Sequence, residues 1–263
     1  MWYNVAMIIK NERKHYASDL TDSQWAMIAP LFPPAGHKSK WEKRELVDAV
    51  LYLVENGCKW RNLPHDFPPY TTVSNFYHAA VKSGLWEKLL AALVAQTREQ
   101  ADKKAQPTYG IIDSQSVKTT GPAQERRIDG GKKTKGRKRH IVVDTMGNLL
   151  AVVVHAANIH DTKAGILAAK RAVEKYPSIR RFCADAGYRK TFEQDVKETL
   201  GLEVDISARI KPEWAVLPKR WIVERTLAWI NYSRRLSKDY EITVESAQAM
   251  CMIAALRTLI ARF

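Results

Sequence analysis

The spacing of apolar residues changes near Pro107, and this change restricts the possible folds more than any other sequence feature. Before it, apolar residues recur at helical spacing; after it, short apolar or β-branched runs of strand length alternate with helical stretches. The predicted strands are 109–113, 141–144, 149–154, 182–185 and 204–207, and the predicted helices among and after them are 161–176, 190–200, 221–236 and 244–260. Residues 144–148 join two strands as a hairpin. The sequence therefore predicts an α/β fold, a mixed sheet with flanking helices, preceded by a small all-α domain.

The first hundred residues predict the helical domain. Thr21 is the expected N-cap of a first helix, with Gln24 as its capping-box partner, and Gly57 is the expected C-cap of a second. Two more helices are expected over 71–81 and 85–94. The expected segments are a tail at 1–17, the helical domain at 18–97, a linker at 98–107 and the sheet-containing domain at 108–263.

The third predicted helix has one polar side that suits a helix-turn-helix. Thr72, Asn75 and His78 lie on that side, where small polar groups could face a major groove, whereas Val73 and Tyr77 are packing candidates. A plain helical bundle with a solvated polar face has the same periodicity, so both interpretations stay open at this point.

Composition excludes several classes of protein. Of 263 residues, 46% are hydrophobic and 27% charged, as in globular proteins. No apolar run approaches the roughly 18 residues of a membrane span, and the N-terminus lacks the pattern of a signal peptide. Cys58, Cys183 and Cys251 have no paired spacing, which argues against a disulfide framework or a zinc knuckle. We expect a cytoplasmic protein.

The charge indicates a polyanionic partner. The chain has 42 basic and 28 acidic residues and a net charge of +14, which makes double-stranded DNA the leading candidate. Residues 126–140 hold eight Lys or Arg among three glycines. Such a run is commonly a solvated loop, but its position beside the first strand favours a clamp on DNA phosphates. The predicted clamp residues are Lys132, Lys133, Lys135, Arg137, Lys138 and Arg139.

Three acidic residues occupy positions that suit metal binding or catalysis. Asp113 and Asp185 each end a predicted strand, and ligand sites of open α/β sheets gather outside the carboxyl ends of strands. Two carboxylates there could share a divalent metal such as magnesium or manganese, although a single strand-end Asp often only caps a turn. Glu224 lies on a helical stripe with Arg220, where the alternative is a simple i, i+4 ion pair.

Five motifs in this half occur in an order that resembles a known family. They are 111–118 (IIDSQSVK), 136–140 (GRKRH), 158–161 (NIHD), 184–188 (ADAGY) and 220–226 (RWIVERT). They closely resemble the DDE transposases of bacterial insertion sequences, in the IS5 group of the IS4-like superfamily. Residues 20–25 and 57–64 resemble the helical DNA-binding region of that group, so the resemblance covers about 18–262.

The resemblance implies an RNase H-like catalytic domain in which Asp113, Asp185 and Glu224 are the catalytic, metal-binding triad, with two Mg²⁺ or Mn²⁺ ions per site. It also implies a DNA-binding role for Arg220, which matches the family's arginine near the glutamate. The sequence departs from the broader superfamily at Leu217 and Asn231, which replace a tyrosine and a lysine. Basic contacts from the same helix could come instead from Arg234, Arg235 or Lys238.

The expected function is that of a transposase that binds terminal inverted repeats and carries out two-metal DNA cleavage and strand transfer, as a homodimer or larger assembly on nucleoid DNA in a bacterium. One alternative is an RNase H-like nuclease without strand transfer. Another is a non-catalytic DNA-binding remnant, against which the intact Asp113, Asp185 and Glu224 speak.

The remaining candidate residues each allow two interpretations. Trp214, Trp221 and Trp229 could stack on an extruded base, although core packing is the commoner role. His155 and His160 resemble a ligand pair only superficially. We expect Asp161 to be the N-cap of the helix that follows it.

Overall fold

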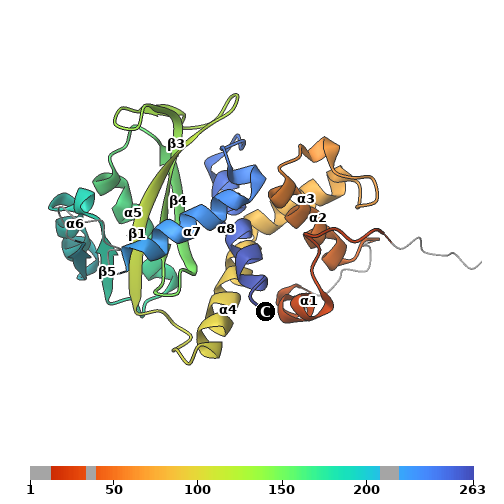
Figure 1. The fold of residues 1–263 in the computed structure, drawn as a ribbon, viewed down its shortest axis with the longest axis horizontal. Helices are drawn as coiled ribbons and strands as arrows, with labels where there is room; N and C mark the ends of the chain where they lie inside the picture. The colour runs from red at the N-terminus through yellow and green to blue at the C-terminus, as the bar shows by residue number, and fades with distance from the viewer. Residues whose placement is uncertain (1–12, 34–39, 208–218) are drawn as a thin grey trace, which may run out of the picture.

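The structure is a computed structural model and describes residues 13–33, 40–207 and 219–263. Four helices come first, then six strands with two helices among them, then two final helices (Figure 1). The first helices are α1 (Asp22–Ile28), α2 (Lys43–Asn56), α3 (Tyr70–Lys82) and α4 (Leu85–Gln100). The strands are β1 (Tyr109–Lys118), β2 (Arg127–Asp129), β3 (Thr134–Val143), β4 (Leu149–Ala156), β5 (Arg181–Ala184) and β6 (Glu203–Ile206). The other helices are α5 (Asp161–Lys175), α6 (Thr191–Leu200), α7 (Arg220–Tyr232) and α8 (Val244–Ile260).

The six strands form one mixed sheet with β1 at its centre. Strand β1 runs antiparallel to β3 and parallel to β5, β5 continues in parallel to β6, and both β4 and β2 pair with β3 in antiparallel fashion. Helices α5 and α6 lie on one side of the sheet in Figure 1, and α7, α8 and α4 lie on the other. The predicted α/β fold, an RNase H-like mixed sheet with flanking helices after a helical region, is confirmed.

Three strands are longer than predicted, and the difference is largest for β1 and β3, since β4 gains only two residues. Strand β1 continues to Lys118 and β3 begins at Thr134, because the two pair without interruption from Ile111–Val143 to Lys118–Gly136. The polar and basic side chains of this stretch resemble a loop in the sequence, but the structure gives most of them partners inside the protein. Gly136 is required here, since a Cβ on it would lie 1.9 Å from the carbonyl oxygen of Val117.

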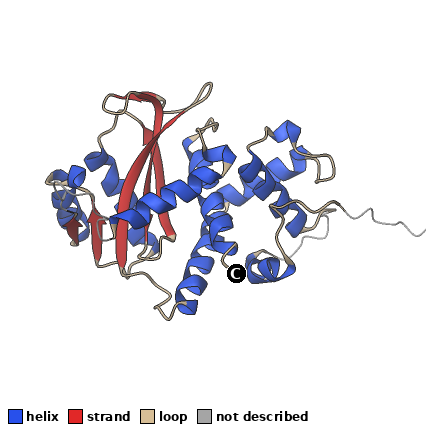
Figure 2. Cartoon of the chain, viewed as in Figure 1, coloured by secondary structure: helices blue, strands red, loops and turns tan. Residues whose placement is uncertain are grey.

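The helical region and the sheet share a core. Helix α8 is buried on nearly every side and contacts α2, α4 and β4, so it lies between the two parts of the molecule (Figures 1 and 2). Helix α4 extends through Gln100, three residues into the predicted linker, because the buried Arg98 donates to Asp144 at 2.7 Å. That ion pair fastens the end of α4 to the β3–β4 hairpin. Over the described residues, the structure has no helix long and apolar enough to cross a bilayer.

Candidate active site

The parallel pairing of β1 and β5 brings two of the three predicted acids to the same level of the sheet. The last pair between these strands is Ile111 with Cys183, so Asp113 and Asp185 each lie two residues further along. The sequence predicts that Asp113 ends its strand, but in the structure Asp113 lies in the middle of β1. Strand β1 continues beside β3 after its pairing with β5 has ended. Asp185 follows β5 directly and begins a short 3₁₀ turn, Ala186–Tyr188.

Hydrogen bonds to the backbone hold both aspartates. Asp185 accepts the N–H of Gly187 at 2.8 Å, and Asp113 accepts the N–H of Ser114 at 2.7 Å. The turn at Asp185 is tight, since a Cβ on Gly187 would lie 3.0 Å from Asp185 Oδ1. Each carboxylate keeps one oxygen, Oδ2, out of these backbone bonds.

Helix α7 brings the third acid. It packs on β1 and β3 through the apolar stripe that the sequence predicts, Val223, Leu227 and Ile230, all of them buried. Glu224 lies on the exposed side, and its Oε1 is 3.0 Å from Arg220 Nε. The same guanidinium reaches Asp185, with Nη2 to Oδ2 at 3.6 Å. Arg220 therefore links the α7 glutamate to the aspartate after β5.

Burial and neighbouring carboxylates both disfavour the ionised form of Asp113. Burial raises the pKa of Asp113 to about 6, and the carboxylates of Asp185 and Glu224 raise it too, whereas the Ser114 N–H and Arg220 lower it. Carboxylate oxygens are the donors that Mg²⁺ and Mn²⁺ prefer, so the donor set suits such an ion. Among the residues that the structure describes, no three His, Cys, Asp or Glu side chains form a ready-made cage, and here Arg220 supplies the positive charge.

A buried polar network lies on the opposite face of the sheet. The hydroxyl of Tyr188 is 2.9 Å from His140 Nε2, and His140 Nδ1 is 2.7 Å from His155 Nε2. His155 thus pairs with His140 and not with His160. Nothing in the spacing of these residues indicates this network; the only signal in the sequence is the aromatic residue three positions after Asp185.

The prediction for Asp161 is wrong. His160 is the N-cap of α5 and accepts the N–H of Thr162, whereas Asp161 is the first residue of the helix and pairs with Lys138 at 3.0 Å. A basic partner from β3 draws the carboxylate away from the helix N–H groups.

The six predicted clamp residues divide into two groups. Lys132, Lys133 and Lys135 are exposed around the turn between β2 and β3. The other three are buried, which contradicts their expected place on the DNA-facing surface: Arg137, Lys138 and Arg139.

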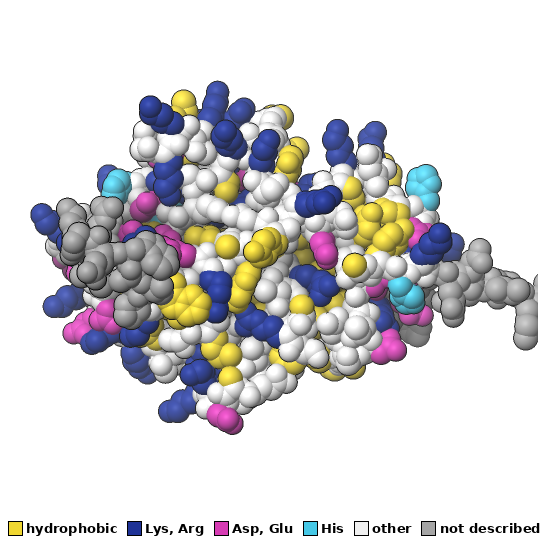
Figure 3. Space-filling view, in the orientation of Figure 1, with side chains coloured by type: hydrophobic (Ala, Val, Ile, Leu, Met, Phe, Trp, Pro, Cys, Tyr) yellow, Lys and Arg dark blue, Asp and Glu magenta, His cyan; other side chains and the backbone are white. Residues whose placement is uncertain are grey.

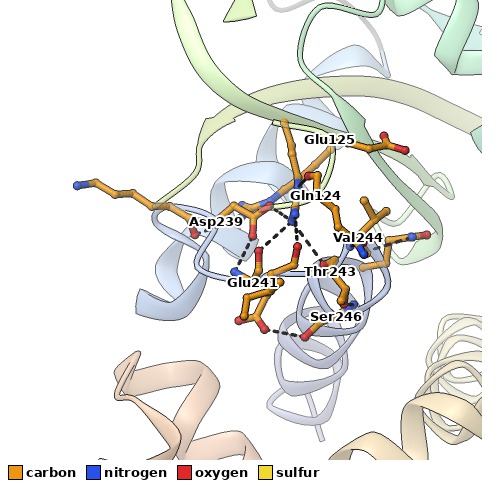
Figure 4. A network of polar contacts seen from close by, with 12 residues as sticks. Gln124, Glu125, Asp239, Glu241, Thr243, Val244 and Ser246 are labelled. Atoms are coloured by element: carbon orange, nitrogen blue, oxygen red, sulfur yellow. Dashed lines mark hydrogen bonds and ion pairs between the residues drawn. The ribbon is translucent and has the colours of Figure 1, made fainter. Parts of the chain in front are cut away.

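Arg137 is completely buried, with its guanidinium and Nε bonded on every side. It pairs with Asp239 at 3.1 Å and donates to the carbonyls of Glu241, Ile242 and Gln124. Figure 4 shows further contacts of this network, in which Ser246 donates to Glu241 and Val244 donates to Gln124. These contacts satisfy the arginine inside the protein, so it is part of the core.

Arg139 and Lys138 also have partners inside the protein. Arg139 donates to the carbonyls of Leu236 and Lys238, and Lys138 donates to that of Ile159 besides its pairing with Asp161. These two side chains fasten β3 to the segments on either side of it.

The remaining predicted DNA contacts lie on other elements. Asn75 and His78 are exposed and Thr72 is half-buried on the outer side of α3, as a recognition helix requires. Arg234 is exposed, whereas Arg235 is buried, pairs with Glu241 at 2.7 Å and donates to the carbonyl of Cys58. Figure 3 shows Lys and Arg side chains along the upper edge of the molecule in that view, over both the sheet and the helical region.

Two of the predicted tryptophans flank an arginine. The guanidinium of Arg225 lies 4.5 Å from the ring centre of Trp221 and 4.3 Å from that of Trp229. Trp221 is 41% exposed. Trp214 and Leu217 lie outside the described residues.

Two family models match the chain. The family described as "Transposase DDE domain" matches residues 104–259, and the family described as "Putative transposase of IS4/5 family" matches residues 20–90.

The chain also aligns with individual proteins. The chain is 31% identical over 145 residues to "Putative transposase for insertion sequence element IS402" of Burkholderia cepacia, covering 50% of this chain and 64% of that protein. It is 30% identical over 118 residues to "Uncharacterized protein y4sN" of Sinorhizobium fredii (strain NBRC 101917 / NGR234), covering 43% of this chain and 87% of the relative. Among solved structures, a pre-cleavage Mos1 transpososome aligns at 12% identity and a TM-score of 0.31, covering 88% of this chain and 80% of that chain.

Proposed function

The chain belongs to the DDE transposases, with an IS4/5-type helical region before the DDE domain, and from this premise we propose that it binds the terminal inverted repeats of its own element and cleaves and joins DNA with Asp113, Asp185 and Glu224. The chain is a transposase enzyme; the triad, the repeat binding and the strand transfer are the proposal. The observation that supports it best is the shared level of Asp113 and Asp185, with Arg220 linking Glu224 to the second aspartate.

Asp113, Asp185 and Glu224 would hold divalent metal, in our proposal two Mg²⁺ or Mn²⁺ ions. When bound, such ions make a nucleophilic oxygen more acidic and stabilise the charge on the leaving oxygen. Asp113 is on the central strand β1, which contacts both β5 and α7, so we assign to it the middle place in the set of acids that would hold the metal. Burial, and to a smaller extent the carboxylates of Asp185 and Glu224, raise its pKa, so a bound cation would stabilise the ionised form of Asp113.

The DNA would contact three surfaces. We assign base contacts to Thr72, Asn75 and His78 on α3, and phosphate contacts to the exposed Lys132, Lys133 and Lys135 and to Arg234. Arg220, which lies beside the carboxylates, would contact a phosphate at the site of cleavage. The partner is double-stranded DNA, held by a homodimer or larger assembly, and in a bacterium the protein would lie with the nucleoid.

The decisive experiment compares Glu224→Gln with Glu245→Gln. Both glutamates are exposed on helices, but Glu245 begins α8 and has no part in the proposed site. We expect Glu224→Gln to abolish Mg²⁺- or Mn²⁺-dependent cleavage and joining of terminal-repeat DNA while keeping fold and DNA binding, and Glu245→Gln to remain active. Glu241 is unsuitable as a control, because it is buried and bonded to Arg235 and Ser246.

The same assay separates the alternatives. Cleavage without joining of a 3′-OH to target DNA would indicate a nuclease of this fold, and binding without cleavage by the wild type would indicate a non-catalytic remnant. Full activity of purified Glu224→Gln would refute the assignment of the glutamate.

A further inference from the structure

We propose that Tyr188, His140 and His155 form a positioning relay that holds the chain at Asp113 and Asp185 from the opposite face of the sheet and so sets the affinity of the site for divalent metal. This inference rests on the proposed function, since it concerns the same two carboxylates. None of the three relay residues belongs to the triad.

The relay is buried and continuous. Tyr188, His140 and His155 are 1%, 0% and 4% exposed. The Tyr188 hydroxyl lies 2.9 Å from His140 Nε2, His140 Nδ1 lies 2.7 Å from His155 Nε2, and His155 Nδ1 lies 2.9 Å from the carbonyl oxygen of Ala156. The relay therefore runs from the turn after β5, across β3, to the end of β4.

The chemistry of its last member fixes the direction of every hydrogen bond. A carbonyl oxygen can only accept, so His155 Nδ1 donates to Ala156 and, in a neutral ring, Nε2 accepts. His140 Nδ1 must then donate to His155, and its Nε2 must accept the Tyr188 hydroxyl proton. Burial lowers the pKa of both imidazoles, which agrees with two neutral rings.

Two members of the relay, Tyr188 and His140, adjoin the proposed metal ligands. Ser114, which follows Asp113, pairs with His140 across β1 and β3. Tyr188 ends the 3₁₀ turn that Asp185 begins. The bond from Tyr188 to His140 therefore ties the turn of the second aspartate to the strand beside the first.

Helix α5 is shaped to hold Tyr188 in this position. A Cβ on Gly165 would lie 2.9 Å from Tyr188 Cε1 and 3.1 Å from the ring of Phe192. The Tyr188 and Phe192 rings meet edge to face, with centroids 5.2 Å apart. Packing would hold a phenylalanine at 188 in the same place, so the hydroxyl is what the relay adds.

The test is Tyr188→Phe, which removes only that hydroxyl, with Tyr77→Phe as the matched control. Tyr77 is also 1% exposed, and its hydroxyl bonds Ser246 Oγ at 2.8 Å, but it lies on α3. Binding of Mn²⁺ alone to the full chain is measured by calorimetry, with thermal unfolding alongside. We expect Tyr188→Phe to weaken Mn²⁺ binding about tenfold or more, and Tyr77→Phe to leave Mn²⁺ affinity within twofold of wild type while losing similar thermal stability.

A second pair of variants covers the case in which Tyr188→Phe does not fold. In His140→Gln the amide can both donate to His155 and accept from Tyr188, whereas His140→Leu can do neither. We expect His140→Gln to keep Mn²⁺ affinity near the wild-type value and His140→Leu to lose it as Tyr188→Phe does.

The outcomes separate this inference from the proposed function. Wild-type Mn²⁺ binding that Asp113→Asn does not weaken would overturn the proposed site. Wild-type binding that depends on Asp113 but is unchanged within twofold in Tyr188→Phe and His140→Leu would overturn the relay alone.

Discussion

Nη2 of Arg220 lies 3.6 Å from Oδ2 of Asp185, although one residue begins α7 and the other follows β5. The two side chains are 32% and 28% exposed, so solvent screens the pair and its contribution to stability is small. Its importance is electrostatic, because Arg220 also lowers the pKa of the nearby Asp113. In the metal-free protein the arginine partly neutralises the acids that would hold metal.

Replacing Arg220 with Gln should therefore raise the pKa of Asp113 further above about 6. The variant keeps a polar side chain but removes the positive charge, so the ionised form of Asp113 becomes less favourable. A ¹³C NMR titration of the aspartate carboxyl groups measures the shift. Arg257→Gln, which removes an arginine from α8 near Glu55, is the control. An Asp113 titration that is unchanged in Arg220→Gln would contradict the coupling.

Asp113→Asn should stabilise the metal-free protein at alkaline pH. The folded-state pKa of about 6 is above the ordinary value of 3.8, so the folded state binds the proton more tightly than the unfolded state does. The resulting loss in the free energy of unfolding is absent below pH 3.8, grows as the pH rises towards 6 and is complete above pH 6. A shift of about two pKa units corresponds to about 3 kcal/mol in the free energy of unfolding at pH 8.

Urea unfolding at pH 4 and pH 8 measures this effect. Asp102→Asn is the matched control, because Asp102 is exposed and its φ of 53° suits asparagine equally well. Equal stability of wild type and Asp113→Asn at pH 8 would show that the acid carries no such cost.

Local signals were enough to predict most helices and the hairpin. The capping box of Thr21 and Gln24 and the left-handed cap at Gly57 are confirmed, because these features depend on residues within one turn. The basic half of β3 was not predictable. The partners that bury Arg137 and Arg139 lie about a hundred positions later, and no local pattern indicates them.

The candidate site likewise combines features that local motifs predict with contacts between residues far apart in the sequence. The motifs predict Asp113, Asp185 and Glu224 as the site acids, but the sequence could not indicate that Arg220 reaches Asp185, since that contact depends on how α7 packs on the sheet. Tyr188 and His140 were missed for the same reason, because β3 and the turn after β5 meet only in the folded protein.

Arg137→Ala should destabilise the fold severely. It leaves Asp239, which is 2% exposed, as a buried carboxylate without its partner, and it removes donors from several carbonyls. Breaking such a pair costs about 3–5 kcal/mol. Urea unfolding of Arg137→Ala and of Lys135→Ala, an exposed neighbour on the same strand, tests this. Equal unfolding midpoints for the two variants would place Arg137 outside the core network.

Replacing the three exposed lysines of the β2–β3 turn should weaken binding to all DNA sequences alike. Lys133 has a φ of 48°, so the variant carries Lys132→Ala, Lys133→Asn and Lys135→Ala to avoid backbone strain. Each lost phosphate contact should reduce the slope of log K against log salt by about 0.9. Lys103→Ala with Lys104→Ala, on the exposed loop after α4, is the control. A slope equal to that of wild type would exclude these lysines as phosphate contacts.

Asn75→Ala tests whether α3 reads sequence or only packs. The helix buries Val73, Tyr77 and Ala80 on its inner side, so removing the exposed Asn75 amide leaves that packing intact. If Asn75 contacts a base edge, the preference for terminal repeats over random DNA should fall by roughly 1–3 kcal/mol, with non-specific binding unchanged. Competition binding on terminal-repeat DNA and on random DNA measures the sequence preference and the non-specific affinity. Asn56→Ala, which removes an exposed asparagine at the end of α2, should change neither. Equal losses of Asn75→Ala on both DNAs would mean that Asn75 contacts phosphate, and no loss on either would favour the plain helical bundle.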